Sequence, residues 1–286
     1  MECIRRPRKK DCAMKKRINK LKDNTVQILE TLILIVAAIV PFVISTKDVF
    51  KEYLAQNTLS PDNFVKYIAI SRGKYVAAVI LVGVALLAIR KINATATMNR
   101  RGCYHDYPYC WYWYCAKILG FKKCNLVQVP IHTQFELILR GVFDDYPLND
   151  TDFPEVQDET ISVKKANEEY DNKEINLILE DTYPISVKQI PKAKRMLRTI
   201  TVSRNDGKSV GRHFSQSFIE ATINAARELP NECTVNVFAT TNPKNTVHIA
   251  RRAFMLAERG NIAHLYVFQQ KNSAKRSFEY KGYKIY

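Results

Sequence analysis

Glycine is scarce in this chain, and the glycine-rich nucleotide motifs are absent. The sequence has 9 glycines among 286 residues. It contains no G-x-G-x-x-G and no G-x-x-x-x-G-K-[ST], so it has neither the dinucleotide fingerprint nor the P-loop. So few glycines also argue against a pyrophosphate that is held by backbone N–H groups. If a nucleotide binds here, side chains must do most of the binding.

The cysteines do not form a recognised metal pattern. The chain has 7 cysteines, and Cys103, Cys110, Cys115 and Cys124 follow the spacing C-x6-C-x4-C-x8-C near His105. Structural zinc sites usually offer paired C-x2-4-C spacings, so we expect no metal site. Packing cysteines in an interfacial, aromatic-rich helix are the preferred interpretation. Reversible palmitoylation of cysteines beside the membrane is the alternative.

Two long apolar runs organise the chain. Residues 26–45 contain a single charge, Glu30, and residues 75–89 contain none. A bilayer core of about 30 Å needs roughly 20 mostly apolar residues, which the first run supplies. The second run reaches that length only with Tyr67 to Ile70, which places Arg72 and Lys74 inside the span. Alternatively, these two long side chains extend to the interface. Basic residues flank both runs, and no A-x-A-like cleavage site follows the first, so transmembrane helices are predicted in preference to buried core helices or a signal peptide.

The net charge of +16 is concentrated beside these runs. Residues 1–124 carry 22 Lys and Arg against 8 Asp and Glu, whereas residues 151–286 carry 21 against 16. Basic residues next to membrane spans indicate orientation and attraction to anionic lipid. We therefore expect a multi-pass cell-membrane protein with both termini in the cytoplasm and lipid as a partner. Binding to nucleic acid is not expected.

The composition predicts four segments. They are a basic cytoplasmic tail (1–24), two transmembrane helices with a short external loop (25–91), a juxtamembrane aromatic and cysteine-rich segment with a linker (92–158), and a cytosolic α/β domain (159–286).

Short apolar runs alternate with helical patterns in the last segment. Strands are predicted at 175–179, 199–203, 234–239 and 265–268, and helices at 215–228 and 246–258. A further strand is expected at 160–163 and a hairpin at 276–286, and a helix is expected at 131–143 in the preceding segment. Alternation of this kind is typical of βαβ units. The predicted fold class is α/β, with two N-terminal transmembrane helices followed by a Rossmann-like domain whose sheet is mainly parallel.

Polar clusters follow each of these strands. In an open parallel sheet, ligands bind beyond the carboxyl ends of the strands. Ser215 and Asn245-Thr246 are expected to cap two helices there, and helix N-termini attract anions. Arg204, Arg212 and Lys244 are the candidates for phosphate contacts, and Asp181, Thr240, Thr241 and Asn242 for ribose or base contacts. The full candidate site is Asp181, Thr182, Tyr183, Arg204, Arg212, His213, Ser215, Thr240, Thr241, Asn242 and Lys244.

Catalytic patterns are weak by comparison. His213, Ser215 and Asp181 could be drawn as a triad, but Ser215 does not lie on a G-x-S-x-G elbow. A capping serine beside a surface histidine is the preferred interpretation. No catalytic residue and no cofactor are predicted.

The plan of the whole chain resembles the membrane effectors of bacterial antiphage systems. Those proteins place two transmembrane helices before a cytosolic domain that senses a nucleotide second messenger. The resemblance lies in the architecture and not in a motif. It implies an effector that binds a nucleotide-like signal, forms homo-oligomers and acts on the membrane through its helices. Two alternatives stay open: a membrane-tethered nucleotide hydrolase or transferase, and a membrane anchor with a protein-binding domain.

Overall fold

The chain forms two compact units. The first holds the chain up to Thr97 together with Tyr114–Lys122, and the second holds Met98–Trp113 and Lys123–Tyr286. The structure is a computed structural model that describes residues 22–43, 61–100, 102–155, 159–169, 173–204, 211–255, 261–273 and 275–286. Most of the predicted basic tail and the predicted loop up to residue 60 lie outside the described residues.

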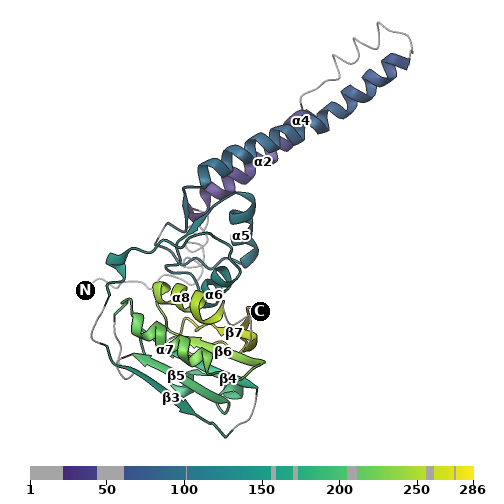
Figure 1. The fold of residues 1–286 in the computed structure, drawn as a ribbon. Coiled ribbons are helices and arrows are strands. Elements are labelled where there is room, and N and C mark those ends of the chain that lie inside the picture. Colours follow the sequence, from purple (N-terminus) through teal and green to yellow (C-terminus); the bar gives the residue numbers. More distant parts are fainter. Residues whose placement is uncertain are drawn as a thin grey trace, which may run out of the picture. The chain divides into compact units, whose positions relative to one another are not determined.

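Two antiparallel helices make up most of the first unit. Helix α2 spans Thr25–Val43 and helix α4 spans Pro61–Asn93. They run side by side (Figure 1). The rings of Phe42 and Tyr75 meet edge to face at 5.2 Å, and Asn93 Nδ2 donates to Glu30 Oε2 at 3.0 Å. The pairing therefore has an aromatic contact toward one end and a polar contact toward the other.

The outward faces of both helices are apolar. Val36 on α2 is 56% exposed, and Val79 and Leu87 on α4 are 73% and 70% exposed. Soluble proteins rarely expose long contiguous apolar surfaces. Thr25–Val43 and Arg72–Asn93 are long and apolar enough to cross a membrane. The exposed apolar faces favour membrane spans over buried core helices.

Residues 114–122 close the first unit. The π-helical turn η1 (Tyr114–Ile118) places the Tyr114 hydroxyl 3.1 Å from the Thr31 hydroxyl. Arg90 Nη1 donates to the Ile118 carbonyl at 3.1 Å. Gly120 has φ +84°, and a Cβ there would lie 2.8 Å from Cγ of Arg90. Only glycine fits where this segment approaches α4.

A six-stranded sheet forms the centre of the second unit. Its strands are β3 (Ile161–Ala166), β4 (Glu174–Glu180), β5 (Arg198–Arg204), β6 (Cys233–Ala239), β7 (Ile262–Phe268) and β8 (Tyr283–Lys284), in the order β3-β5-β4-β6-β7-β8. Strands β5, β4, β6 and β7 are parallel, whereas β3 and β8 pair antiparallel at the two edges. The prediction of a mainly parallel sheet is therefore corrected to a mixed sheet. Continuous apolar runs mark the parallel strands, which are buried on both faces. The predicted strand at 160–163 overlaps β3 and the predicted hairpin at 276–286 contains β8, but the sequence did not show that both edge strands pair antiparallel.

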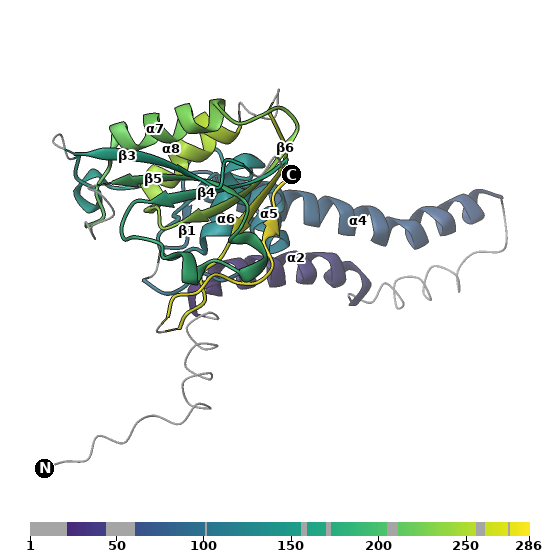
Figure 2. The same cartoon turned by 90° about the horizontal axis from the view of Figure 1, so that it is seen from below.

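Helices α7 (Gln216–Arg227) and α8 (Pro243–Ile249) lie along one side of the sheet (Figures 1 and 2). Helix α8 continues as the π-helical turn η6 (Ala250–Phe254), and α6 (Ile131–Leu139) packs against α8 and β7. Two short elements precede α6: helix α5 (Tyr109–Trp113) and a pair formed by β1 (Thr97–Met98) and β2 (Lys123–Cys124).

The predicted strand positions and the first helix cap are confirmed, and the second cap is wrong. The side chain of Ser215 caps α7 by accepting from Phe218 N. Helix α8 starts at Pro243 with Asn242 as its cap, three residues before the predicted start at Thr246. The sequence did hold this signal, because proline is favoured at the first helical position, directly after an asparagine cap.

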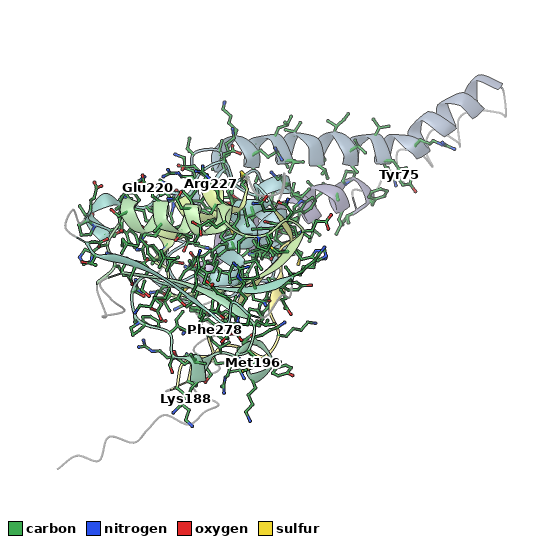
Figure 3. The ribbon with its side chains drawn as sticks, turned by 60° about the horizontal axis from the view of Figure 1, so that its bottom comes forward. Tyr75, Lys188, Met196, Glu220, Arg227 and Phe278 are labelled. Carbon is green, nitrogen blue, oxygen red and sulfur yellow. The ribbon has the colours of Figure 1, made fainter. Side chains whose placement is uncertain are left out.

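Paired residues of parallel strands point to the same face of the sheet, so the strand register shows which face each core residue lies on. Ile178 pairs with Phe238, and Phe238 pairs with Phe268. On that face they pack with Phe278 (labelled in Figure 3), Ile185 and Ile190. The segment between β4 and β5, with Ile185 and Ile190, and the segment after β7, with Phe278, therefore cover the face of the sheet opposite α7 and α8.

Candidate ligand-binding site

The predicted site lies at the carboxyl ends of β4, β5 and β6. The chain passes from β4 to β5 on one side and then returns past β4 to β6 on the other. In open α/β sheets, ligands bind in the crevice that such a reversal creates. The structure thus brings the predicted strand-end residues together at a favourable place.

Asp181 is the centre of this edge, and its side chain is fully buried. Its Oδ2 accepts from the backbone N–H of Asn242 at 2.9 Å, from Asn242 Nδ2 at 3.0 Å and from Asn245 Nδ2 at 2.9 Å. Its Oδ1 pairs with Arg204 Nη1. Burial raises the pKa of the Asp181 carboxyl, and the Asn242 N–H and the Arg204 guanidinium oppose that shift. The carboxylate is held by a complete set of partners.

Arg204 joins Asp181 to a second carboxylate. Its Nη2 pairs with Glu159 Oε1, and the other oxygen of Glu159 accepts from the Ser215 hydroxyl. The carbonyl of His213 accepts from Arg204 Nη1 at 3.4 Å and from Asn242 Nδ2 at 2.8 Å. Removing one member of this buried group should destabilise the fold, because it leaves an unpaired charge in the protein interior.

The threonines of the predicted site tie the strand ends to each other. Thr240 Oγ1 donates to the carbonyl of Tyr183 at 2.9 Å and accepts from Asp181 N at 3.2 Å. Thr182 Oγ1 donates to the carbonyl of Thr240 at 2.7 Å. The hydroxyls of Thr241 and Thr246 lie 2.7 Å apart. These hydroxyls stabilise the turns after β4 and β6.

The accessible members form a rim around this buried network. Arg212 is exposed, and His213 is half-buried. Lys244 Nζ lies 4.6 Å from the centroid of the Phe214 ring, and the Tyr183 hydroxyl donates to Gln270 Oε1 at 2.6 Å. Six predicted residues are buried: Asp181, Arg204, Ser215, Thr240, Thr241 and Asn242. A ligand at this edge would meet the rim first.

Glu159 and Asn245 belong to this network, and the predicted site omits both. The sequence placed Asn245 in the polar cluster after β6, but only as a predicted helix cap. In the structure its side-chain amide donates a hydrogen bond to Asp181 Oδ2. Glu159 is far from Arg204 in sequence and follows an acidic segment that is typical of a linker. Spacing alone could not have paired Glu159 with Arg204.

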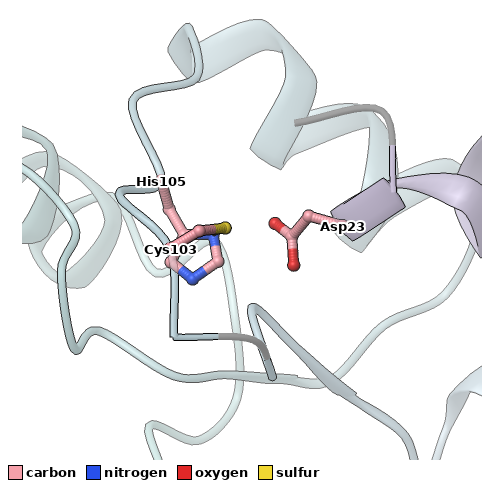
Figure 4. A group of neighbouring side chains, drawn as sticks. All are labelled: Asp23, Cys103 and His105. Atoms are coloured by element: carbon pink, nitrogen blue, oxygen red, sulfur yellow. The ribbon is translucent and has the colours of Figure 1, made fainter. Parts of the chain in front are cut away.

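The cysteine-rich segment holds a smaller polar group. Cys103 Sγ lies 3.9 Å from His105 Nδ1, and both belong to the second unit (Figure 4, which also draws Asp23 of the first unit). A tetrahedral zinc site needs four ligands, so this pair does not suffice for one. Cys115 and Cys124 are buried, as packing cysteines are expected to be, but Cys124 lies in strand β2 and not in a helix, and Cys110 in helix α5 is exposed.

A second buried polar group lies in the membrane unit. Glu30 is 7% exposed and accepts from Asn93 Nδ2, which also donates to the carbonyl of Leu119 at 3.0 Å. Gln27 is buried one turn before Glu30. Polar groups within a span are expensive unless they are paired, and here Asn93 supplies the interhelical bond.

The comparisons with known proteins agree with this two-helix plan. No curated protein matches the chain. A protein-family model described as "SMODS- and Ubiquitin system-associated 2TM effector domain" matches residues 13–286, which include both candidate spans and the whole second unit. The chain belongs to this family of two-transmembrane effector domains.

Proposed function

We propose that the chain is a membrane effector in antiphage defence whose α/β unit binds a nucleotide-like signal and acts through its two spans. The family and the two apolar helices support the membrane effector. The nucleotide-like ligand, a Rossmann-like mode of binding at the strand ends and a homo-oligomeric active form are parts of the proposal.

The observation that carries the ligand proposal is the polar network at the point where the strand order reverses. Asp181, Arg204 and Glu159 hold the turns after the strands in place. Arg204 Nε is buried and has no hydrogen-bond partner among the described residues, which leaves a donor for an anionic oxygen. The network carries two carboxylates and one guanidinium, so attraction of phosphate falls to Arg212 and Lys244 at the rim.

The rim residues provide the sharpest test. A hydrogen bond to a charged group contributes roughly 1.5–3 kcal/mol, so Arg212→Ala should weaken nucleotide binding by about tenfold to a hundredfold. Folding should be unaffected, because Arg212 is exposed. Calorimetry of the purified full chain against a panel of cyclic and linear nucleotides measures this.

Arg227→Ala is the matched control. Arg227 is an exposed arginine at the far end of α7 (labelled in Figure 3), so this variant should bind as the unmodified chain does. No binding across the panel, or binding that is indifferent to Arg212 and Lys244 together, would overturn the proposed site. Slow consumption of the bound nucleotide would instead support the alternative of a membrane-tethered enzyme.

The action on the membrane is tested separately. Purified protein in vesicles loaded with a fluorescent dye should release the dye when the nucleotide that binds is added. Dye that stays inside despite saturating ligand would contradict an effect through the spans and favour a protein-binding anchor.

Both termini are proposed to lie in the cytoplasm. Lys91 lies in the last turn of the second candidate span and Arg100 follows it, and basic residues near span ends favour the cytoplasmic side. A reporter that is active only in the cytoplasm, fused after Tyr286, should be active. A reporter that is active only outside the cytoplasm should be silent at the same position. The reverse result would invert the topology.

A further inference from the structure

A cavity of about 690 Å³ shares no lining residue with the strand-end site and lies over the start of β4, the first half of β6 and the second half of β7. Asn236 pairs with Tyr266 across β6 and β7, and Phe268 follows two residues later on the same face. The cavity is therefore on the face that the helices leave uncovered. Its lining residues are Lys173, Glu174, Lys194, Thr234, Asn236, Tyr266, Phe268, Tyr280, Lys281 and Gly282.

The floor of the cavity is polar and firmly built. Asn236 is 1% exposed, and its Nδ2 donates to Glu174 Oε1 at 2.9 Å. Glu174 also pairs with Lys194, whose carbonyl accepts from Asn176 Nδ2 at 2.6 Å. Central strands usually fill such positions with apolar side chains, which need no partners. A fixed polar floor is what recognition of a polar ligand requires.

The charges around the cavity favour an anion. Three lysines line it against one glutamate. Lys194 is held by Glu174, whereas Lys173 forms an ion pair with Glu232 in which both side chains are about three-quarters exposed, at 74% and 77%. Exposed pairs are worth little, so Lys173 can exchange Glu232 for a ligand anion at small cost. Lys281 adds an exposed positive charge at the opening.

Aromatic rings form the wall. Tyr266 and the buried Phe268 come from β7, and Tyr280 is 76% exposed at the rim. The loop that carries Tyr280 is anchored on both sides, because Phe278 is in the core and Ile285 N donates to the carbonyl of Leu265 at 2.8 Å. Planar ligand groups stack favourably on such rings.

We propose that this cavity is a second binding site, which takes a phosphate-bearing ligand with a planar ring, of the size of a nucleoside monophosphate. The volume fits a small molecule, since such sites measure roughly 300–1,000 Å³. Lys173 and Lys281 bind the phosphate, Tyr280 and Tyr266 contact the ring, and Asn236 with Glu174 offers polar contacts at the floor. The site does not depend on the proposed strand-end site, with which it shares no residue.

Photolabelling of the full chain in detergent with 8-azidoadenosine monophosphate tests the site, with mass spectrometry of the labelled peptides. Label on peptides that hold Tyr266, Tyr280 or Lys194 is expected, and unlabelled adenosine monophosphate should compete it away. Label confined to peptides that hold Arg212 or Lys244 would support the strand-end site and overturn the second site. Absence of any specific label would also overturn the second site.

The double variant Tyr280→Ala/Lys281→Ala provides the quantitative test. It should weaken binding of a fluorescent adenosine monophosphate by about tenfold or more, as measured by anisotropy, because it removes a stacking ring and a phosphate contact. Its thermal unfolding should match that of the unmodified chain, since both side chains are exposed. Lys271→Ala removes an exposed lysine outside the cavity and should bind normally. Equal affinities for the double variant and this control would overturn the proposal.

Discussion

The two ends of the same parallel strands are built differently. At the carboxyl ends, Arg204 has a side chain with 0% exposure and two carboxylate partners. At the other end, Lys194 is 25% exposed and Lys173 is 74% exposed, beside an open cavity. A buried charged group that lies between two carboxylates holds the chain in place, whereas an exposed lysine such as Lys173 can exchange its partner for a ligand. The strand-end network therefore fixes the positions of the rim residues, whereas the cavity leaves room for the second ligand proposed above.

Breaking the strand-end network should have the largest effect. Arg204→Met leaves Asp181 and Glu159 buried without their cation, which should cost about 3–5 kcal/mol of unfolding free energy. Thermal unfolding of the purified chain, followed by circular dichroism, measures this. Arg212→Met, at an exposed position of the same site, is the matched control. If the two variants unfold at the same temperature, the buried network does not hold the edge together.

Filling the cavity wall should have the next largest effect. A Cβ at Gly282 would lie 2.7 Å from Cε2 of Phe268, whose ring is stacked on Phe238 at 4.5 Å and cannot easily move. Gly282→Ala should therefore destabilise the chain by about 1–3 kcal/mol and weaken binding in the cavity. Gly102→Ala adds the same methyl group where nothing lies within 4 Å and should unfold normally. Equal stability of the two variants would mean that the loop shifts freely, and the cavity would not be preformed.

The sequence predicted the strands better than it predicted their partners. The run Ile175–Leu179 lies inside β4 because a strand buried on both faces needs continuous apolar residues, and that need is visible in one segment. The pairing of Glu159 with Arg204 depends on contacts between distant segments. No local pattern records such a contact.

The strand-end residues were predicted as a group, but their accessibility was not. Arg204 ends an apolar strand, and an arginine after a strand is usually exposed. Arg204 is buried here because Glu159 and Asp181 pair with it, and these pairings appear only in the folded structure. The cavity was missed for the same reason, because Lys173, Lys194, Asn236 and Tyr280 come from four separate segments. The sheet register brings these segments together, and a single sequence does not fix that register.

The first unit, which holds the two candidate spans, also contains a buried hydrogen-bonded polar pair, Asn93 and Glu30, whose contribution to stability can be compared with that of Arg204. Asn93→Leu removes the bond between α4 and Glu30, and such bonds are worth about 0.6 kcal/mol on average within a membrane. The variant should show a small loss of thermal stability in detergent. Ile92→Leu, at the exposed neighbouring position, should show none. A loss as large as that of Arg204→Met would mean that Glu30 is as dependent on its partner as the strand-end carboxylates are.

The smallest expected effect is a pH dependence beside the cavity loop. The His132 ring stacks on Tyr283 at 3.7 Å, and burial lowers the pKa of His132 below its ordinary value of 6.5. The folded chain therefore favours the neutral ring. Its contribution to stability is present above about pH 6.5 and is lost as the pH falls through the lowered pKa. His132→Gln should flatten this part of the stability curve, whereas His264→Gln, at an exposed histidine, should not. Identical curves for both variants would contradict this assignment.

The edges of the sheet limit how copies of this chain can associate. Strand β3 forms one edge and presents Lys164 and Lys165, both exposed, while β8 forms the other edge with two residues. Lysines on an edge strand and very short edge strands both discourage pairing between sheets of different molecules. Continuous β-sheet filaments are therefore disfavoured. For the proposed homo-oligomer, contacts through helices and loops are therefore favoured over pairing of sheet edges.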